Sequence, residues 1–253
     1  MPFFDKPPVR IHYEEFGTAS GHPLLLLAPG GLNSALSNWS PGPGPSAVFN
    51  PTEVFRNDFR MIAMDQRNAL TGESTGPVET EDPWDAYLDD QLALLDHLGI
   101  DRFFALGFCI GCSFALGLAR KAPTRLTAMV LCQPIGHRPE DPDVLYDSGL
   151  NWGKELVQRR SDVDVPTVER MLQNMYRSPA DFVYSVSRDF VASCQTPVLV
   201  LPGNDRPHPH DVGLEVAKLA QRSALRDPWK QPDLIPETIA RIRGFLNEVV
   251  EPM

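Results

Sequence analysis

Short, continuous apolar runs alternate along this chain with stretches in which apolar residues recur every three or four positions. Runs of the first kind, closed by glycine, proline or polar residues, predict strands at 9–17, 23–31, 59–68, 101–108, 126–136 and 196–205. Helical spacing predicts helices at 84–100, 110–123 and 234–250. Strands that alternate with helices predict an α/β fold with a mostly parallel central sheet flanked by helices. In such a sheet, ligands bind at the carboxyl ends of the strands.

Residues 137–193 interrupt this alternation. Their apolar spacing predicts no strand but three short helices, at 149–160, 166–177 and 179–194. We therefore expect one core formed by residues 1–136 and 194–253. The insertion at 137–193 is expected to form a small helical lid over the edge of the sheet where ligands bind.

The composition restricts the expected cellular compartment and the classes of binding partner. At 253 residues the chain has the length of one large domain, and its formal net charge of −10 argues against nucleic acid or an anionic membrane as a partner. The first residues lack the basic and apolar segments of a secretory signal, and no apolar run is long enough to span a bilayer. The four cysteines are therefore expected as reduced thiols in a cytoplasmic protein. A small-molecule substrate is the expected partner, and a homodimer stays open.

A cysteine stands between two glycines where a buried strand stops and a helix starts. The stretch Gly-Phe-Cys-Ile-Gly at 107–111 has the order of a nucleophile elbow, a sharp turn that lifts one side chain above the sheet. Small residues two positions to either side are needed because backbone segments approach closely there. A thiol at a helix N-terminus is also made more acidic by the helix dipole. Cys109 is thus the candidate nucleophile, against the common alternative of a buried, inert thiol.

Several segments, taken in order, resemble the α/β-hydrolase fold superfamily, with cysteine where most members have serine, as in dienelactone-hydrolase-like proteins. The segment "LLLLAPGG" resembles the strand and oxyanion loop, "MIAMDQRNALTGES" the next strand and turn, and "TPVLVLPGND" the strand that delivers the triad acid. The resemblance implies that Asp205 is that acid. It also implies that an oxyanion is held by the backbone N–H of Gly31 or Leu32 together with that of Ile110.

Two other interpretations share the elbow stretch. In a shifted frame Ser113 would be the nucleophile, but it lies about one helical turn beyond Cys109 and should point along the helix. Cys109 and Cys112 also have the Cys-x-x-Cys spacing of a dithiol oxidoreductase. The strand series is unlike that of a thioredoxin-like fold, so a disulfide between them is left only as an oxidative off-switch.

The histidine of an ordinary triad is missing from its usual place. The resemblance places it between the last strand and the terminal helix, yet residues 223–239 contain none, and Lys230 falls about there. We prefer His208, three residues after Asp205 and flanked by prolines, then His137, with His210 more solvated. A cysteine tolerates this loss better than a serine, because its thiol is already partly ionised near neutrality.

Aromatic side chains and His137 could line an apolar pocket near the elbow. The expected lining residues are Trp39, Phe108, His137, Trp152, Tyr176 and Tyr184. We expect no cofactor and no metal, because histidines and cysteines form no cluster with ligand spacing. The sequence thus predicts a hydrolase that cleaves an ester, lactone, thioester or related acyl substrate through an acyl-enzyme on Cys109. The alternatives are a non-hydrolytic binding or regulatory member of the same fold, an acyltransferase or a lyase.

Overall fold

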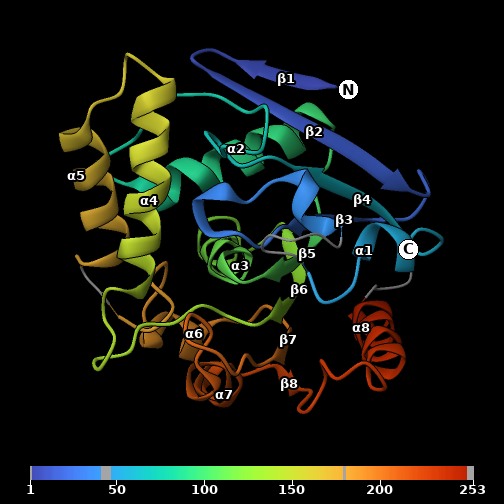
Figure 1. Cartoon of the computed structure of the whole chain (residues 1–253). Coiled ribbons are helices and arrows are strands. Elements are labelled where there is room, and N and C mark those ends of the chain that lie inside the picture. Colours follow the sequence, from blue (N-terminus) through green and yellow to red (C-terminus); the bar gives the residue numbers. More distant parts are fainter. Residues whose placement is uncertain (1, 41–46, 179–180, 250–253) are drawn as a thin grey trace.

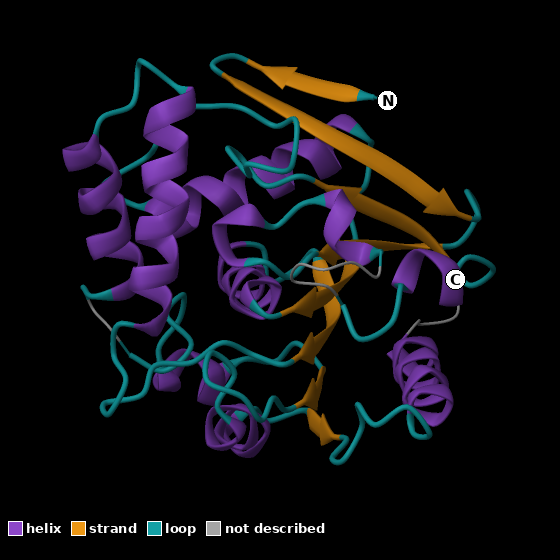
Figure 2. Cartoon of the chain, in the orientation of Figure 1, coloured by secondary structure: helices purple, strands orange, loops and turns teal. Residues whose placement is uncertain are grey.

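A computed structural model describes residues 2–40, 47–178 and 181–249, and its centre is one twisted sheet of eight strands (Figures 1 and 2). The strand order across the sheet is β1-β2-β4-β3-β5-β6-β7-β8. The strands are β1 (Phe3–Lys6), β2 (Val9–Gly17), β3 (His22–Leu27), β4 (Phe59–Met64), β5 (Phe103–Phe108), β6 (Leu126–Cys132), β7 (Val198–Leu201) and β8 (Ser223–Leu225).

The sheet is parallel from β4 to β8, and β1 and β2 join one edge in antiparallel pairing. All six residues of β5 are buried, and β5 pairs with β3 on one side and β6 on the other. A strand buried on both faces needs apolar residues at every position, which explains its continuous apolar run. The carboxyl end of β5 therefore lies in the middle of the sheet, between the loops that follow β3 and β6.

Helices cover both faces of the sheet (Figure 2). They are α1 (Pro51–Val54), α2 (Pro83–His97), α3 (Ile110–Lys121), α4 (Val144–Arg159), α5 (Val165–Tyr176), α6 (Arg188–Ser193), α7 (His210–Leu219) and α8 (Ile235–Val249), and two 3-10 turns, η1 (Gly31–Asn33) and η2 (Leu36–Trp39), follow β3. One apolar cluster joins α2, α3, α4, α5 and α7 to the sheet, and a second joins α1 and α8 to the opposite face. Alternate residues of a strand feed alternate clusters, as the two-residue period requires.

The fold class predicted from the sequence is confirmed. The structure adds elements that the apolar pattern did not reveal: edge strands β1 and β8, the short α1, and α7 after β7. β1 and β8 are only four and three residues long and contain no buried residue, so they lack the buried runs that mark the central strands.

The insertion between β6 and β7 forms α4, α5 and α6 and contains no strand among its described residues. The helix expected at 179–194 is helical only over Arg188–Ser193. Its first two residues, 179–180, lie outside the described residues. Phe182 and Tyr184 have φ values of 45° and 66°, a left-handed backbone that a right-handed helix cannot include, so the prediction was wrong for this stretch. Among the described residues, no helix is both long and apolar enough to cross a membrane.

Candidate active site

Cys109 stands on a sharp turn between β5 and α3. Its φ and ψ are 58° and −120°, an unfavourable backbone for a residue with a side chain. The turn depends on its two glycines. A Cβ on Gly107 would come 2.3 Å from Gly111 O, and a Cβ on Gly111 would come 2.2 Å from Leu27 O of β3. The Gly-x-Cys-x-Gly spacing therefore reflects close backbone approach, and the packed sheet holds Cys109 in its strained conformation.

His208 and Asp205 lie on the loop that follows β7. His208 Nδ1 is 2.5 Å from Asp205 Oδ1, and the two residues also form an isolated backbone bridge. This tight turn requires Gly203, because a Cβ there would come 2.3 Å from the Cβ of His208. The other ring nitrogen, Nε2, is buried and meets no hydrogen-bond partner of ordinary geometry among the described residues. The side chain of Asp205 thus orients the imidazole and leaves Nε2 for another group.

That other group is the thiol of Cys109, and the two residues shift each other's pKa. Burial is the largest influence on Cys109 and opposes its ionisation, but the positive charge of His208 and hydrogen bonding to it hold the thiol's pKa below the ordinary value. Burial also opposes protonation of His208, but the thiolate charge and then Asp205 raise the pKa of that imidazole. Both shifts move the pair toward a thiolate beside an imidazolium, the ionisation state of an activated cysteine nucleophile.

Two backbone N–H groups face the sulfur. Those of Gly30 and Ile110 lower the pKa of the Cys109 thiol as hydrogen-bond donors. Ile110 was expected here from the sequence, but Gly30 was not. Gly31 borders the same cavity, whereas the Leu32 side chain is buried in the core and the residue does not line the cavity. The Pro-Gly-Gly sequence indicated the loop, and only its folded conformation selected Gly30.

A cavity of about 310 Å³ opens at Cys109 and His208. Its lining comes from the loops after β3, β5, β6 and β7, from the first turn and a half of α4 and from the last residue of α5: Pro29, Gly30, Gly31, Cys109, Ile110, Gln133, Ile135, Val144, Leu145, Ser148, Tyr176, Pro207 and His208. Apart from Tyr176 the walls are aliphatic or polar. The lining residues from α4 belong to no sequence motif, so they could be identified as part of the cavity only from the folded structure.

Most of the aromatic pocket predicted from the sequence is absent. Of the six residues named, only Tyr176 lines the cavity. Trp39 and Phe108 pack edge to face at 5.9 Å on the opposite side of the sheet, in the cluster beneath α8. Phe108 points there because side chains alternate along a strand, and Phe108 shares one face of β5 with Phe104 and Leu106.

The three remaining predicted pocket residues do not border the cavity. Trp152, on the buried face of α4, donates from Nε1 to Asn68 O at 3.0 Å. Tyr184 donates to Gly136 O at 3.4 Å, and the His137 ring packs against it at 6.2 Å. His137 is thus held in the start of the insertion, and the structure brings His208 rather than His137 to Cys109.

The alternatives at the elbow have structural roles. Ser113 Oγ donates to Val183 O at 2.8 Å and is fully buried. Cys112 Sγ contacts the carbonyls of Gly107 and Cys132, and burial raises the pKa of its thiol well above the ordinary value. All four cysteines are free. Neither Ser113 nor Cys112 has the exposure or the proton-accepting partner that a nucleophile requires.

His210 is engaged away from the cavity: its Nε2 lies 2.8 Å from Asp227 Oδ2 in the loop after β8. Among the described residues, no group of three or more His, Cys, Asp or Glu side chains is placed to hold a metal ion. The cavity lining itself presents Cys109, His208 and backbone amides, with Asp205 behind His208.

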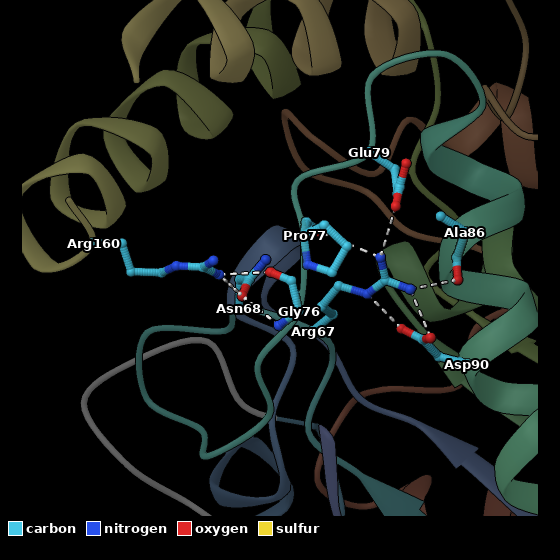
Figure 3. Close-up of polar contacts among 8 residues, drawn as sticks. All are labelled: Arg67, Asn68, Gly76, Pro77, Glu79, Ala86, Asp90 and Arg160. Carbon is cyan, nitrogen blue, oxygen red and sulfur yellow. Dashed lines mark hydrogen bonds and ion pairs between the residues drawn. The ribbon is translucent and has the colours of Figure 1, made fainter. Parts of the chain in front are cut away.

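Loop 65–77 after β4 anchors the far end of α4 (Figure 3). Arg160, just beyond α4, donates to Asn68 Oδ1 at 2.7 Å and to Gly76 O at 2.6 Å. Arg67 in the same loop is paired with Asp90 of α2, Nε to Oδ2 at 2.8 Å and Nη2 to Oδ1 at 2.7 Å. These bonds tie the insertion to the core, and with them the helix whose other end borders the cavity.

Asp65, at the start of that loop, accepts the backbone N–H groups of Leu36 and Glu73 at 2.8 Å each and lies 2.7 Å from His12 Nδ1. Asp65 and Arg67 therefore brace loops. The bond to Leu36 connects loop 65–77 to the segment that follows the Pro-Gly-Gly turn.

A mostly parallel sheet whose central strand ends in a strained turn before a helix is the architecture of α/β hydrolases. The sequence profile of the α/β hydrolase fold family matches residues 23–185, and the chain belongs to that family. "Putative carbamate hydrolase RutD" of Agrobacterium fabrum is 26% identical over 121 residues, covering 48% of this chain and 42% of that protein. "Probable proline iminopeptidase" of Leptolyngbya boryana is 30% identical over 144 residues, covering 56% of this chain and 40% of that protein.

The chain thus matches less than half the length of these two relatives. Among solved structures, MGS-M2, an α/β hydrolase enzyme from a Medee basin deep-sea metagenome library, is similar over 100% of this chain and 99% of its own. The TM-score is 0.72 and the sequence identity 18%. This likeness establishes the shared fold across the whole chain.

Proposed function

We propose that this protein is a hydrolase that cleaves a small ester, thioester, lactone or related acyl substrate through an acyl-enzyme on Cys109. The observation that carries the proposal is that Cys109, on its strained elbow, and His208 line the same cavity, where each shifts the other's pKa toward a thiolate and an imidazolium. The two curated relatives, named as a carbamate hydrolase and an iminopeptidase, support hydrolysis at a carbonyl as the reaction type. The cavity of about 310 Å³ suits a small substrate.

The proposed reaction has two halves. The Cys109 thiolate attacks the substrate carbonyl, and the N–H groups of Gly30 and Ile110 stabilise the oxyanion of the tetrahedral intermediate. The imidazolium of His208 gives its proton to the leaving group as the carbon–leaving-group bond breaks. Neutral His208 then takes a proton from water, which attacks the thioester carbonyl. Collapse of that second intermediate releases the carboxylic acid and returns the thiolate and imidazolium.

Asp205 takes the role of orienting the imidazole and stabilising its positive charge. The insertion at 137–193 serves as a lid in this proposal, because α4 contributes Val144, Leu145 and Ser148 to the cavity wall. Such a cover excludes water from the acylation step, which strengthens the electrostatic interactions inside.

Intact-mass spectrometry of the reduced protein after brief exposure to activated acyl esters and thioesters tests the proposal, with released product measured in parallel. We expect a transient adduct of one acyl group that is absent from Cys109→Ala and present in Cys112→Ala and Ser113→Ala. Those two variants are matched controls from the same helix. An adduct that survives Cys109→Ala contradicts the assignment. Tight binding of acyl ligands without adduct or product, retained in Cys109→Ala, would instead support a binding protein on a hydrolase fold.

A further inference from the structure

Gln133, the first residue after β6, has a strained backbone beside the nucleophile. Its φ is 56°, in the left-handed region that residues with side chains avoid and that is enriched at functional sites. Its N–H donates to Leu201 O of β7 at 2.8 Å, which fixes the loop to the sheet. Gln133 lines the same cavity as Cys109 and His208. The strain therefore holds a polar side chain at the cavity wall.

Lys230 fixes which end of that side chain meets the cavity. Its Nζ donates to Gln133 Oε1 at 2.7 Å and lies 3.9 Å from Asp205 Oδ2. An ammonium group only donates hydrogen bonds, so the amide oxygen must face Lys230. The amide nitrogen Nε2 is left for the cavity, and no described residue accepts a hydrogen bond from it. Lys230 comes from the loop after β8, where the sequence resemblance had placed a histidine.

The sheet order divides the cavity into two sides. The oxyanion loop follows β3 on one side of β5, whereas Gln133 and His208 follow β6 and β7 on the other. The residue that protonates the leaving group must lie next to it. Gln133 is therefore on the leaving-group side.

We propose that Gln133 Nε2 donates a hydrogen bond to an acceptor atom carried by the substrate's leaving group, and that Lys230 is the positioning residue for this amide. The preferred substrates are then acyl compounds whose leaving group bears a carbonyl or similar acceptor near the scissile bond. This inference rests on the proposed function, since that function defines the leaving-group side.

Two acetyl thioesters test the preference. The leaving group of one is methyl thioglycolate, which carries a carbonyl, and that of the other is butanethiol, an apolar chain of similar length. The measured quantity is the kcat/KM for the thioglycolate thioester divided by that for the butanethiol thioester. The folded fraction of each variant cancels within this ratio, and the intrinsic reactivities of the two thioesters cancel when the ratio is compared between variants. Loss of one neutral hydrogen bond should lower this ratio roughly tenfold in Gln133→Leu.

Further variants separate the amide from its surroundings. Gln133→Glu keeps the size and the Lys230 contact but replaces the donor with an acceptor, so the ratio should fall at least as far. Lys230→Met removes the donor to Gln133 Oε1 and should lower the ratio. Lys230→Arg keeps a donor there and should give a ratio between those of Lys230→Met and the wild type. Gln158→Leu, on the exposed far end of α4, is the matched control and should leave the ratio unchanged.

A second measurement needs no turnover. Methyl levulinate and 2-heptanone are analogues of the thioglycolate and butanethiol thioesters, respectively, in which a CH2 group replaces the sulfur. Their Kd values are obtained from the degree to which each ligand protects Cys109 from alkylation by iodoacetamide. If neither thioester is hydrolysed but Gln133→Leu removes a preference for methyl levulinate, the proposed function fails and the role of Gln133 stands. The inference is overturned if the wild type shows no preference for the carbonyl-bearing compound of each pair. It is also overturned if Gln133→Leu and Gln133→Glu both keep that preference in the kinetic and in the binding measurement.

Discussion

His208 Nδ1 lies 2.5 Å from Asp205 Oδ1, although the two residues are only three positions apart on one turn after β7. The base of the proposed triad and its orienting acid thus come from a single loop, with backbone hydrogen bonds between the same two residues. A short turn of this kind fixes the acid–base geometry locally, and only Cys109 must be brought from elsewhere. The loop after β8 is then free to carry Lys230, which contacts Gln133.

Replacing His208 by glutamine should raise the pKa of the Cys109 thiol. The positive charge of His208 stabilises the thiolate and lowers that pKa, so its removal leaves burial to dominate. At neutral pH the thiolate fraction falls, and the iodoacetamide reaction rate at Cys109 should fall several-fold. Rates measured from pH 5 to 10 give the pKa directly.

His210→Gln is the control for this experiment, because His210 pairs with Asp227 and does not act on Cys109. Its alkylation profile should match the wild type. An unchanged profile in His208→Gln would show that the imidazole does not stabilise the thiolate.

Gly203→Ala should reduce turnover by displacing His208. The added Cβ would come 2.3 Å from His208 Cβ and 2.5 Å from its backbone oxygen, so the turn must open. A shift of about 1 Å at a catalytic group costs roughly 10²-fold in rate. Steady-state kcat on an activated thioester, with thermal unfolding to monitor folding, measures this.

Gly244→Ala in α8 adds the same methyl group at a site where, apart from the backbone of α8 itself, no atom of the described residues lies within 4 Å. It should keep wild-type kcat and unfold at an equal or higher temperature, because alanine favours a helix interior. Equal kcat in Gly203→Ala and Gly244→Ala would mean that the Asp205 turn does not control the site.

Ser113→Ala should destabilise the protein and leave the acyl adduct on Cys109. The hydroxyl donates to Val183 O in a fully buried setting, and its loss leaves that carbonyl without this donor. We expect a loss of about 1 to 3 kcal/mol in the free energy of unfolding, measured by urea titration. Full stability together with loss of the adduct would point to Ser113 as the reactive residue.

Asp90→Ala should lower the free energy of unfolding by about 3 kcal/mol, because it leaves the buried guanidinium of Arg67 without its main partner. Replacing both, as Arg67→Met with Asp90→Leu, should recover much of that loss, since the uncompensated charge is then gone. Urea titrations of the three proteins decide this. If the double variant is no more stable than Asp90→Ala, the unpaired charge of Arg67 is not the cause of the lower stability of Asp90→Ala.

The sequence by itself determined the central architecture and the elbow. Continuous apolar runs closed by turn residues and alternating with helical segments are typical of strands buried on both faces, so β3, β5, β6 and β7 and a mostly parallel sheet could be predicted from local pattern. The glycines around Cys109 are required by atoms of the same turn and of the adjacent strand, so a short motif was enough to identify it. His208 was preferred because it lies close to Asp205 along the chain.

Only the tertiary structure decided what surrounds Cys109. Trp39 was expected in the pocket but lies across the sheet, because a strand pattern does not say which helices cover which face. Gly30, rather than Leu32, faces the sulfur because of loop conformation. Gln133 and Lys230 meet across 97 positions of sequence, and a contact between loops that distant leaves no local pattern to read.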